Sequence, residues 1–375
     1  MAIESMPEPQ SGRYKAFRGN FQEALRGQRV PTNGTIELTE NCNFRCIHCY
    51  QGMQKHKEVL PAARWKEILD EVCEAGTLWM LITGGDPLLH PEFEEIYEYA
   101  IRKGLLVNLF TNGSLVREHH IELFKKYPPF NIEFTLYGMD EATYRVVTGT
   151  KGSHARVLAT CRRLIAEKLP LKLKSVALKQ TVEQLAAMKR FVEQELGLAF
   201  RFDTKIDPGI YGDDFDHVRL SPIEQLDLAE RMHGKAELTV DQQDYARRSA
   251  VPFQQPGFGD KLYTCGAGKM MYYIDYRGWI HTCSGGRLWE EALDLARYPF
   301  REIWDEKLPA VINQKRRNLN AVCVTCEYRP DCDVCPATAK VATGDKEGRP
   351  LYICQVTMER KRRYRMENQL VAARA

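Results

Sequence analysis

The stretch GTIELTENCNFRCIHC, residues 34–49, sets both the fold and the chemistry of this chain. Its first six residues, GTIELT, alternate polar and apolar side chains as a β-strand does. The loop that follows carries Cys42, Cys46 and Cys49. A strand that places three thiols at its carboxyl end predicts a metal or cluster site at one end of a β-sheet.

The alternation of short strand and amphipathic helix continues to about residue 205. Strands are predicted at residues 34–39, 78–83, 106–110, 131–136, 171–178 and 200–206. Helices are predicted at residues 63–75, 91–103, 153–168 and 181–196, and a capped helix at 221–232. Six β/α units in series predict an α/β fold with a parallel sheet, a partial (β/α)6 barrel of the TIM type. In such folds the chemistry lies at the carboxyl ends of the strands.

The rest of the chain suggests further segments around this barrel. We expect an N-terminal extension at 1–33, the barrel at 34–235, and a linker at 236–255. Residues 256–357 form a cysteine-rich domain in which metal ligands replace a large apolar core. Residues 358–375 are predicted to form a basic C-terminal helix with a solvated face.

Composition narrows the class of protein. The 375 residues carry a formal net charge of +3, which is too close to neutral to favour a nucleic-acid partner. The sequence contains no apolar run long enough for a membrane helix and begins without the apolar core of a signal peptide, so we expect a cytoplasmic protein. Of the 12 cysteines, most fall in two clusters, at 42–49 and 265–354. Since a reducing cytoplasm disfavours disulfides, this clustering predicts metal ligation.

Two kinds of metal site fit the first cysteine cluster. Three thiolates can each ligate one iron of a [4Fe–4S] cube and leave the fourth iron open to a substrate. Alternatively, the same thiolates bind zinc with His48 as the fourth ligand. That alternative would make the chain a non-catalytic metal-binding protein.

The loop CNFRCIHC resembles the cluster loop of the radical SAM superfamily, with His48 in the position of the family's aromatic residue. TGGDP (83–87), TNG (111–113) and TLYG (135–138) then end three successive predicted strands, as related motifs do in that family. Asp86 stands where the family usually has Glu, and Tyr137 stands where relatives often have Asp. The resemblance implies that Cys42, Cys46 and Cys49 hold a [4Fe–4S] cluster that cleaves S-adenosylmethionine (SAM) to a hydrogen-abstracting 5′-deoxyadenosyl radical. The SAM-binding residues that it implies are His48, Gly84, Gly85, Asp86, Asn112 and Thr135.

The second cysteine block contains two CxxC pairs, which are also a zinc signature. Its spacing resembles the SPASM extension of radical SAM enzymes, which carries two auxiliary clusters, making three [4Fe–4S] clusters in all. By this resemblance the outer auxiliary cluster takes Cys323, Cys326, Cys332 and Cys354. The inner one takes Cys265, Cys283 and Cys335, so its fourth iron is open or has a non-cysteine ligand. His281 and Asp275 are candidates for that ligand.

Charged residues alternate with apolar ones on several predicted strands. The apolar faces must meet the helices, so the polar faces are expected to point into the barrel. Buried charges must be paired or must bind something polar. They therefore contact SAM or substrate, or they form a structural ion-pair network; the candidates are Glu37, Lys174, Arg201, Asp203 and Lys205.

The resemblance implies a radical SAM oxidoreductase that modifies a ribosomally made peptide by crosslinking, epimerisation or excision. The alternatives are a sulfatase maturase-like enzyme and a small-molecule radical dehydrogenase. About 33 residues precede the first strand, and we expect this to be too short for the winged peptide-recognition domain that many relatives of this kind carry at this end. Either a separate partner protein or the barrel and the tail therefore bind the peptide. The resemblance also implies an electron donor such as flavodoxin or ferredoxin. We expect neither a nucleic-acid partner nor a membrane association.

Overall fold

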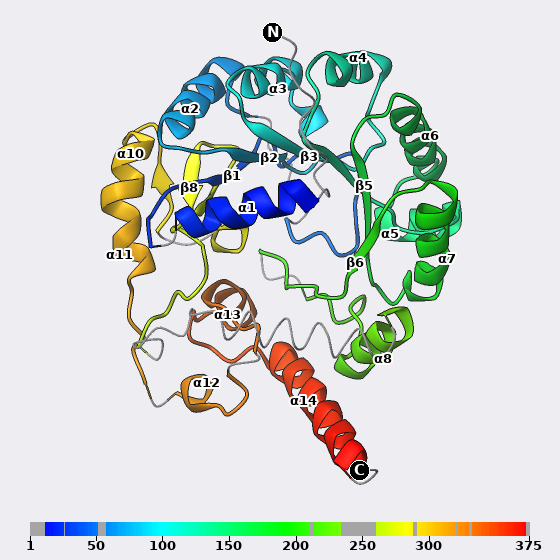
Figure 1. Cartoon of the computed structure of the whole chain (residues 1–375), viewed down its shortest axis with the longest axis vertical. Coiled ribbons are helices and arrows are strands. Elements are labelled where there is room, and N and C mark those ends of the chain that lie inside the picture. Colours follow the sequence, from blue (N-terminus) through cyan, green and yellow to red (C-terminus); the bar gives the residue numbers. More distant parts are fainter. Residues whose placement is uncertain are drawn as a thin grey trace.

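The computed structural model describes residues 12–25, 27–51, 58–210, 214–233, 260–287, 291–319, 321–329 and 332–372. Within these ranges the strands form one nine-stranded sheet in the order β6-β5-β4-β3-β2-β1-β7-β8-β9 (Figure 1). The first six strands are β1 (Asn33–Glu37), β2 (Trp79–Thr83), β3 (Leu106–Phe110), β4 (Asn131–Thr135), β5 (Leu171–Val176) and β6 (Phe200–Asp203).

Strands β1 to β6 are all parallel, and each pairs with the next strand along the chain. This confirms the predicted α/β fold with six β/α units. The sheet does not close, because β6 lies at one edge and β9 at the other. In this partial barrel the strands lie inside and the helices lie outside (Figure 1).

The outer helices bury apolar stripes against the sheet. In α2 (Ala62–Glu74), Trp65, Ile68, Leu69 and Val72 are buried at helical spacing. The other outer helices are α3 (Phe93–Arg102), α4 (Glu118–Lys126), α5 (Glu141–Thr148), α6 (Ser153–Ala166) and α7 (Leu185–Arg190). The predicted helix at 181–196 is divided into the 3₁₀ turn η2 (Val182–Gln184), α7, and the π-helical turn η3 (Phe191–Glu195).

Strand β7 (Met271–Ile274) pairs with β1 in parallel, with Ile36 opposite Ile274. It belongs to the segment predicted as a separate cysteine-rich domain, yet it extends the sheet of the barrel. The antiparallel strands β8 (Trp279–His281) and β9 (Leu293–Asp294) complete this edge. The short helices that follow are η4 (Ser284–Gly286), α10 (Phe300–Glu302), η5 (Ile303–Lys307), α11 (Leu308–Ile312), α12 (Val322–Thr325) and α13 (Pro336–Thr343).

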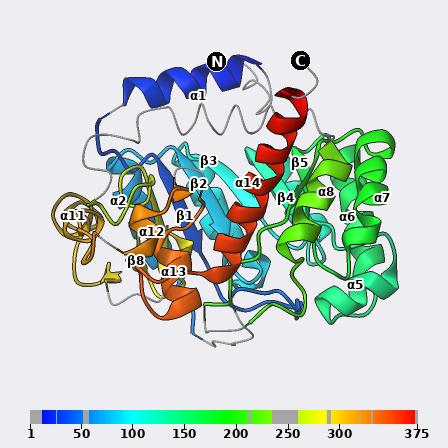
Figure 2. The ribbon, with the colours of Figure 1, turned by 90° about the horizontal axis from the view of Figure 1, so that it is seen from below.

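A helix that was not predicted, α1 (Gly12–Ala24), lies at the end of the sheet where the strands begin. The indole N–H of Trp79, the first residue of β2, donates to the hydroxyl of Tyr14 at 2.8 Å. The Tyr14 ring also packs on Phe130, just before β4. In the view of Figure 2, α1 lies on the opposite side of the sheet from α13, so the carboxyl ends of the strands stay uncovered by it.

The C-terminal helix α14 (Leu351–Ala372) begins earlier than the predicted 358–375 and carries Cys354 in its first turn. It packs against α8 (Pro222–His233), which confirms the helix predicted at 221–232. Arg363 of α14 forms ion pairs with Asp227 and Glu230 of α8, so this part of the helix is not simply solvated. The predicted linker, 236–255, lies outside the described residues. None of the helices in the described ranges combines the length and hydropathy of a membrane span.

Candidate active site

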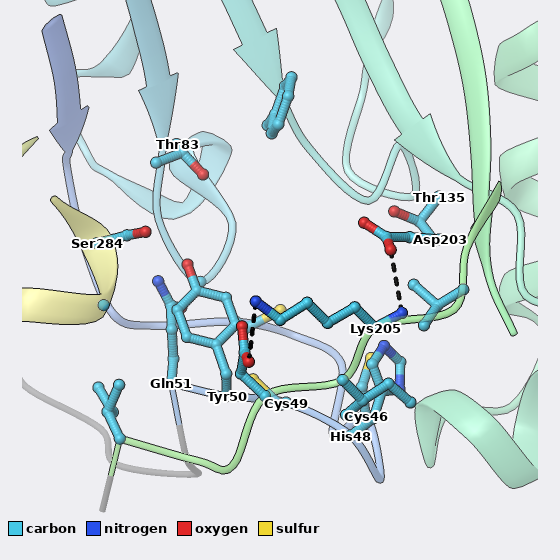
Figure 3. Close-up of a pocket in the computed structure, with 18 of the residues that line it drawn as sticks. Cys46, His48, Cys49, Tyr50, Gln51, Thr83, Thr135, Asp203, Lys205 and Ser284 are labelled. Carbon is cyan, nitrogen blue, oxygen red and sulfur yellow. Dashed lines mark hydrogen bonds and ion pairs between the residues drawn. The ribbon is translucent and has the colours of Figure 1, made fainter. Parts of the chain in front are cut away.

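A cavity of about 650 Å³ opens at the carboxyl ends of the strands (Figure 3). It is lined by the ends of β2 to β6, by the loop after β1, and by the segments around Cys283 and Cys335. Ser284 and Gln51 lie on one side of the view in Figure 3, and Thr135 and Asp203 lie on the other. Both cysteine clusters of the sequence therefore contribute to one cavity.

The three thiols of the first loop, Cys42, Cys46 and Cys49, all line this cavity. Burial raises the pKa of Cys42 to about 11, and burial together with the neighbouring thiols raises the pKa of Cys46 further. Free thiolates are therefore disfavoured here, whereas a bound metal deprotonates its thiol ligands outright. The loop suits metal-bound cysteines better than reactive free ones.

The spacing of the sulfurs distinguishes the two kinds of metal site. A tetrahedral zinc with bonds of about 2.3 Å holds its sulfurs about 3.8 Å apart. In the described part of the chain, no three cysteine sulfurs lie within 4.8 Å of one another. A [4Fe–4S] cube, in which each sulfur binds a different iron, does not need three sulfurs so close together. The described cysteines are therefore not arranged as a mononuclear zinc site.

Gly84 and Gly85 lie where the loop after β2 crosses the loop after β1. A Cβ atom on Gly84 would lie 2.5 Å from the carbonyl oxygen of Thr39, and one on Gly85 would lie 2.4 Å from those of Glu40 and Asn41. The amide of Gly85 donates to the Thr39 carbonyl at 2.7 Å. Both glycines line the cavity. Their lack of a side chain is required by contact between two loops of the protein itself, in addition to any contact with SAM.

Asp86, predicted to bind SAM, is fully buried and is not part of the cavity lining. Its carboxylate accepts hydrogen bonds from the Thr111 hydroxyl at 2.8 Å and from the backbone amides of Asn112 at 2.9 Å and Leu88 at 3.1 Å. Burial raises the pKa of Asp86 to about 6, against the effect of these bonds. Asp86 thus holds the loop after β3, and Asn112 in turn reaches the cavity and donates to Asn43 at 2.8 Å.

His48 and Thr135 both line the cavity, as predicted for SAM-binding residues. The His48 ring lies edge-on to Tyr137, with ring centroids 5.4 Å apart. Burial lowers the pKa of His48 to about 4, so the imidazole is neutral near pH 7. Its Nδ1 atom is buried and has no hydrogen-bond partner among the residues that the structure describes, which leaves a polar atom for a ligand in the cavity.

The charged face expected inside the barrel is present along β4, β5 and β6. Glu133 is nearly buried and pairs with Lys174 at 2.6 Å and with Arg201 at 3.1 Å. Lys174 and Arg201 thus share one carboxylate, whereas Lys205 lies beside two, so cations and carboxylates of the lining balance in number. Lys205 pairs with Asp207 at 3.4 Å, and the backbone amide of Lys205 donates to Asp203. All of these residues line the cavity. The same side chains therefore pair with one another and face the space in which a ligand would bind.

Glu37 differs from the other charged candidates, because its surroundings favour the alternative of a structural ion-pair network. Its side chain is fully buried and lies outside the cavity lining. It pairs with Arg287 at 2.8 Å and accepts a hydrogen bond from Gln51 at 2.7 Å. Burial raises the pKa of Glu37 to about 7, although Arg287 opposes that shift. Glu37 therefore belongs to a structural ion-pair network.

The second cysteine block is brought together in two groups. Cys283 and Cys335 line the cavity. The exposed Cys265 lies close enough to Cys283 for its charge to act on that thiol, as does the charge of Cys335. In the other group, the charges of Cys332 and Cys354 act on Cys323, and Arg349 lies close to Cys326. The structure thus places Cys265 and Cys335 near Cys283, and Cys332 and Cys354 near Cys323.

The two non-cysteine candidates for the inner cluster are engaged elsewhere. His281 lies 3.1 Å from the carboxylate of Asp275, and both side chains are almost fully buried in the β7–β8 hairpin. Asp275 also binds Arg277 and the backbone amide of Trp279. Neither residue lines the cavity, and the contacts of Asp275 leave it little room to act as a ligand of the inner cluster.

Several residues of the cavity were missed by sequence reasoning, among them Thr83, Gln51, Asp207 and Ser284. Gln51 and Ser284 follow predicted ligands by two residues and by one, and that proximity is the signal that points to them. Arg287, which partners Glu37, carries no local signal because its partner lies on a strand far away in the sequence.

Comparison with known proteins agrees with this geometry. Residues 36–192 match the family model of the Radical SAM superfamily. The AdoMet-dependent heme synthase of Methanosarcina barkeri is 26% identical over 328 residues, which cover 82% of this chain and 92% of that protein. The antilisterial bacteriocin subtilosin biosynthesis protein AlbA of Bacillus subtilis is 32% identical over 139 residues. That match covers 36% of this chain and only 31% of AlbA.

Among solved structures, Streptococcus suis SuiB bound to its precursor peptide SuiA superposes with a TM-score of 0.68. The superposition covers 95% of this chain and 84% of SuiB, at 16% sequence identity. At that identity the likeness establishes the fold alone.

Proposed function

The chain belongs to the radical SAM superfamily and is an enzyme with a SPASM-type cysteine-rich region, and we propose that it modifies a ribosomally made peptide. The observation that carries the proposal is the single cavity onto which Cys42, Cys46, Cys49, Cys283 and Cys335 all open. A SAM-activating cluster and an inner auxiliary cluster would then face the same substrate. We place the reaction in the reducing cytoplasm, where such cysteines stay available for clusters.

The first loop would hold the SAM-activating cluster through Cys42, Cys46 and Cys49, which line the cavity together. When bound, this cluster and SAM supply a 5′-deoxyadenosyl radical that abstracts hydrogen. The chain's own residues bind and orient SAM. The neutral His48 ring offers its Nδ1 atom, and Thr135 offers a hydroxyl at the end of β4. Lys174 and Arg201, which share Glu133, suit a carboxylate, either that of SAM or that of the substrate.

We further propose two auxiliary clusters, with Cys265, Cys283 and Cys335 at the inner one and Cys323, Cys326, Cys332 and Cys354 at the outer one. The inner set has three thiols and faces the cavity through Cys283 and Cys335, which suits contact with substrate. The outer set lies away from the cavity lining, which suits electron transfer from a donor such as flavodoxin or ferredoxin. The segments 34–235 and 256–357 remain our proposed boundaries.

A peptide suits the size of the cavity. SAM must share about 650 Å³ with the reacting part of the substrate. A peptide needs to insert only one or two side chains and can keep its remaining length outside, either on the barrel or on a separate recognition protein. The precursor-peptide complex of SuiB, which shares this fold, supports the same class of substrate.

A second candidate is suggested by the match over nearly the whole length of an AdoMet-dependent heme synthase. In that case the substrate would be a tetrapyrrole precursor of heme, and Lys174 and Arg201, which share Glu133, would bind its carboxylates.

One experiment tests both candidates. The anaerobically purified protein is incubated with SAM, a reductant and either candidate precursor peptides or a heme precursor, and the products are analysed by mass spectrometry. Loss of two hydrogens from a peptide indicates a crosslink or oxidation, a larger loss indicates excision, and deuterium uptake from heavy water indicates epimerisation. A heme product with unmodified peptides would overturn the peptide proposal. The Cys46→Ala variant serves as the inactive control.

A further inference from the structure

A buried arginine joins the two cysteine-bearing loops of the cavity. Arg287 has 2% of its side chain exposed, and it follows Cys283 by four residues. Its Nη1 atom lies 2.8 Å from the carboxylate of Glu37, at the end of β1, and its Nη2 atom contacts the carboxylate of Glu40. Both carboxylates are as buried as the guanidinium. One side chain thus bridges two carboxylates on the segment that leads into the first cysteine loop.

The same network holds both ends of that loop. Glu40 precedes Cys42 by two residues, and Gln51 follows Cys49 by two residues. Gln51 donates to the Glu37 oxygen that also accepts from Arg287, at 2.7 Å. The loop from Cys42 to Cys49 therefore starts and ends on residues that contact the Arg287–Glu37 pair.

On its other side, Arg287 ends the turn η4, which carries Cys283 into the cavity. That turn packs tightly against the helix that follows Cys335, because a Cβ atom on Gly285 would lie 2.9 Å from the Cβ atom of Ala337. Arg287 is therefore connected to Cys283 through the turn η4, and to Cys335 through the close packing of Gly285 on the side chain of Ala337. Its partners on β1 and its place on η4 connect the two sets of thiols that line the cavity.

We propose that Arg287 is a positioning residue that fixes the inner auxiliary cluster relative to the SAM-activating cluster. The inference rests on the two clusters of the proposed function but not on the identity of the substrate. A guanidinium suits this task because its planar fork can bind two carboxylates at once, whereas the single ammonium of lysine is a point charge. The network thereby sets the distance between the site where the radical is formed and the inner cluster.

The test compares Arg287→Lys with the wild-type enzyme after reduction, using pulsed EPR to measure the distance between the two clusters. We expect Arg287→Lys to retain its iron and sulfide but to give a shifted or broader distance distribution. Because misplacement of about 1 Å can cost roughly a hundredfold in rate, product formed per SAM cleaved is expected to fall about tenfold to a hundredfold. Glu40→Gln, which weakens one arm of the bridge, is expected to show a smaller change of the same kind and serves if Arg287→Lys does not fold.

Arg363→Lys is the control, because Arg363 also binds several carboxylates, those of Asp227, Glu230 and Glu359, but joins α14 to α8. It is expected to leave the distance unchanged. An unaltered distance and unaltered product yield in both Arg287→Lys and Glu40→Gln would overturn the inference and leave the proposed function intact. A wild-type protein without clusters would overturn both, and clusters with no peptide product would overturn the substrate proposal alone.

Discussion

Replacement of Gly85 by alanine tests whether the two loops at the mouth of the cavity need to touch. The added Cβ atom would lie 2.4 Å from two carbonyl oxygens, those of Glu40 and Asn41, and real Cβ atoms essentially never approach closer than 3.0 Å. The loops must therefore move apart. That movement breaks the hydrogen bonds from the amides of Gly85 and Asp86 to the carbonyls of Thr39 and Asn41, which are 2.7 and 2.8 Å long.

The magnitude follows from these two effects. Forcing an extra carbon into a packed site costs about 1–3 kcal/mol. Two lost backbone hydrogen bonds add about 1 kcal/mol each. We expect Gly85→Ala to lower the free energy of unfolding by about 3–5 kcal/mol.

The assay is denaturant unfolding of the cluster-free protein, because a clash between protein loops acts without cluster or SAM. Gly19→Ala is the control: Gly19 lies in α1 with no atom within 4 Å of an added Cβ. This change is expected to be neutral or to stabilise the chain by up to about 1 kcal/mol. If cluster-free Gly85→Ala unfolds like the wild type while SAM binding is lost, the glycine serves the cofactor alone and the loop-contact reasoning is wrong.

Three further predictions concern single sites. Cys46→Ala is expected to abolish SAM cleavage, whereas Cys326→Ala is expected to lose product but keep some cleavage; equal loss of 5′-deoxyadenosine in two folded variants would contradict this division. Asp86→Asn is expected to destabilise the protein by about 2–3 kcal/mol in thermal unfolding, because the NH2 group of the new side chain would face three hydrogen-bond donors. It is also expected to weaken SAM binding through Asn112. A variant as stable as the wild type would argue against this reasoning. Burial lowers the pKa of His120 to about 4, below its ordinary value near 6.5, so the unfolded chain binds the extra proton between these values. The free energy of unfolding is therefore expected to fall as the pH drops from 6.5 to 4, by at most about 3 kcal/mol. His120→Gln is expected to remove this part of the dependence on pH. If the free energies of unfolding of the variant and the wild type change in parallel across this pH range, the prediction is wrong.

The strands and the motifs at their ends could be predicted because their signals are local. The alternation in LKLKSV of β5 appears directly as alternating burial, and TGGDP marks the end of β2. The grouping of the cysteines at 42–49 and 265–354 was also visible in the sequence, whereas their assignment to individual clusters rests on the resemblance.

Long-range features could not be predicted in the same way. Strand β7 has only four residues, MYYI, and its neighbour in the sheet lies at the other end of the barrel sequence. Without that pairing, nothing indicated that the buried Glu37 would find Arg287. Helix α1 contains two glycines, which lower its intrinsic helix propensity, and it gains its place from contacts such as that of Tyr14 with Trp79. Asp86 was expected in the cavity because the sequence shows that it follows the end of a strand. The sequence does not show the three hydrogen-bond donors that hold its carboxylate away from the cavity.

The pairing of β1 with β7 also has a consequence for how the chain is made. During synthesis the first strand emerges early, but its partner on that side follows only after the whole barrel sequence. Until then β1 is an open edge, with unpaired backbone groups that can recruit strands from other chains. Closing this late, distant contact is intrinsically slow. Expression at low temperature, where translation and aggregation both slow down, and intact residues beyond β7 are therefore conditions for obtaining soluble protein.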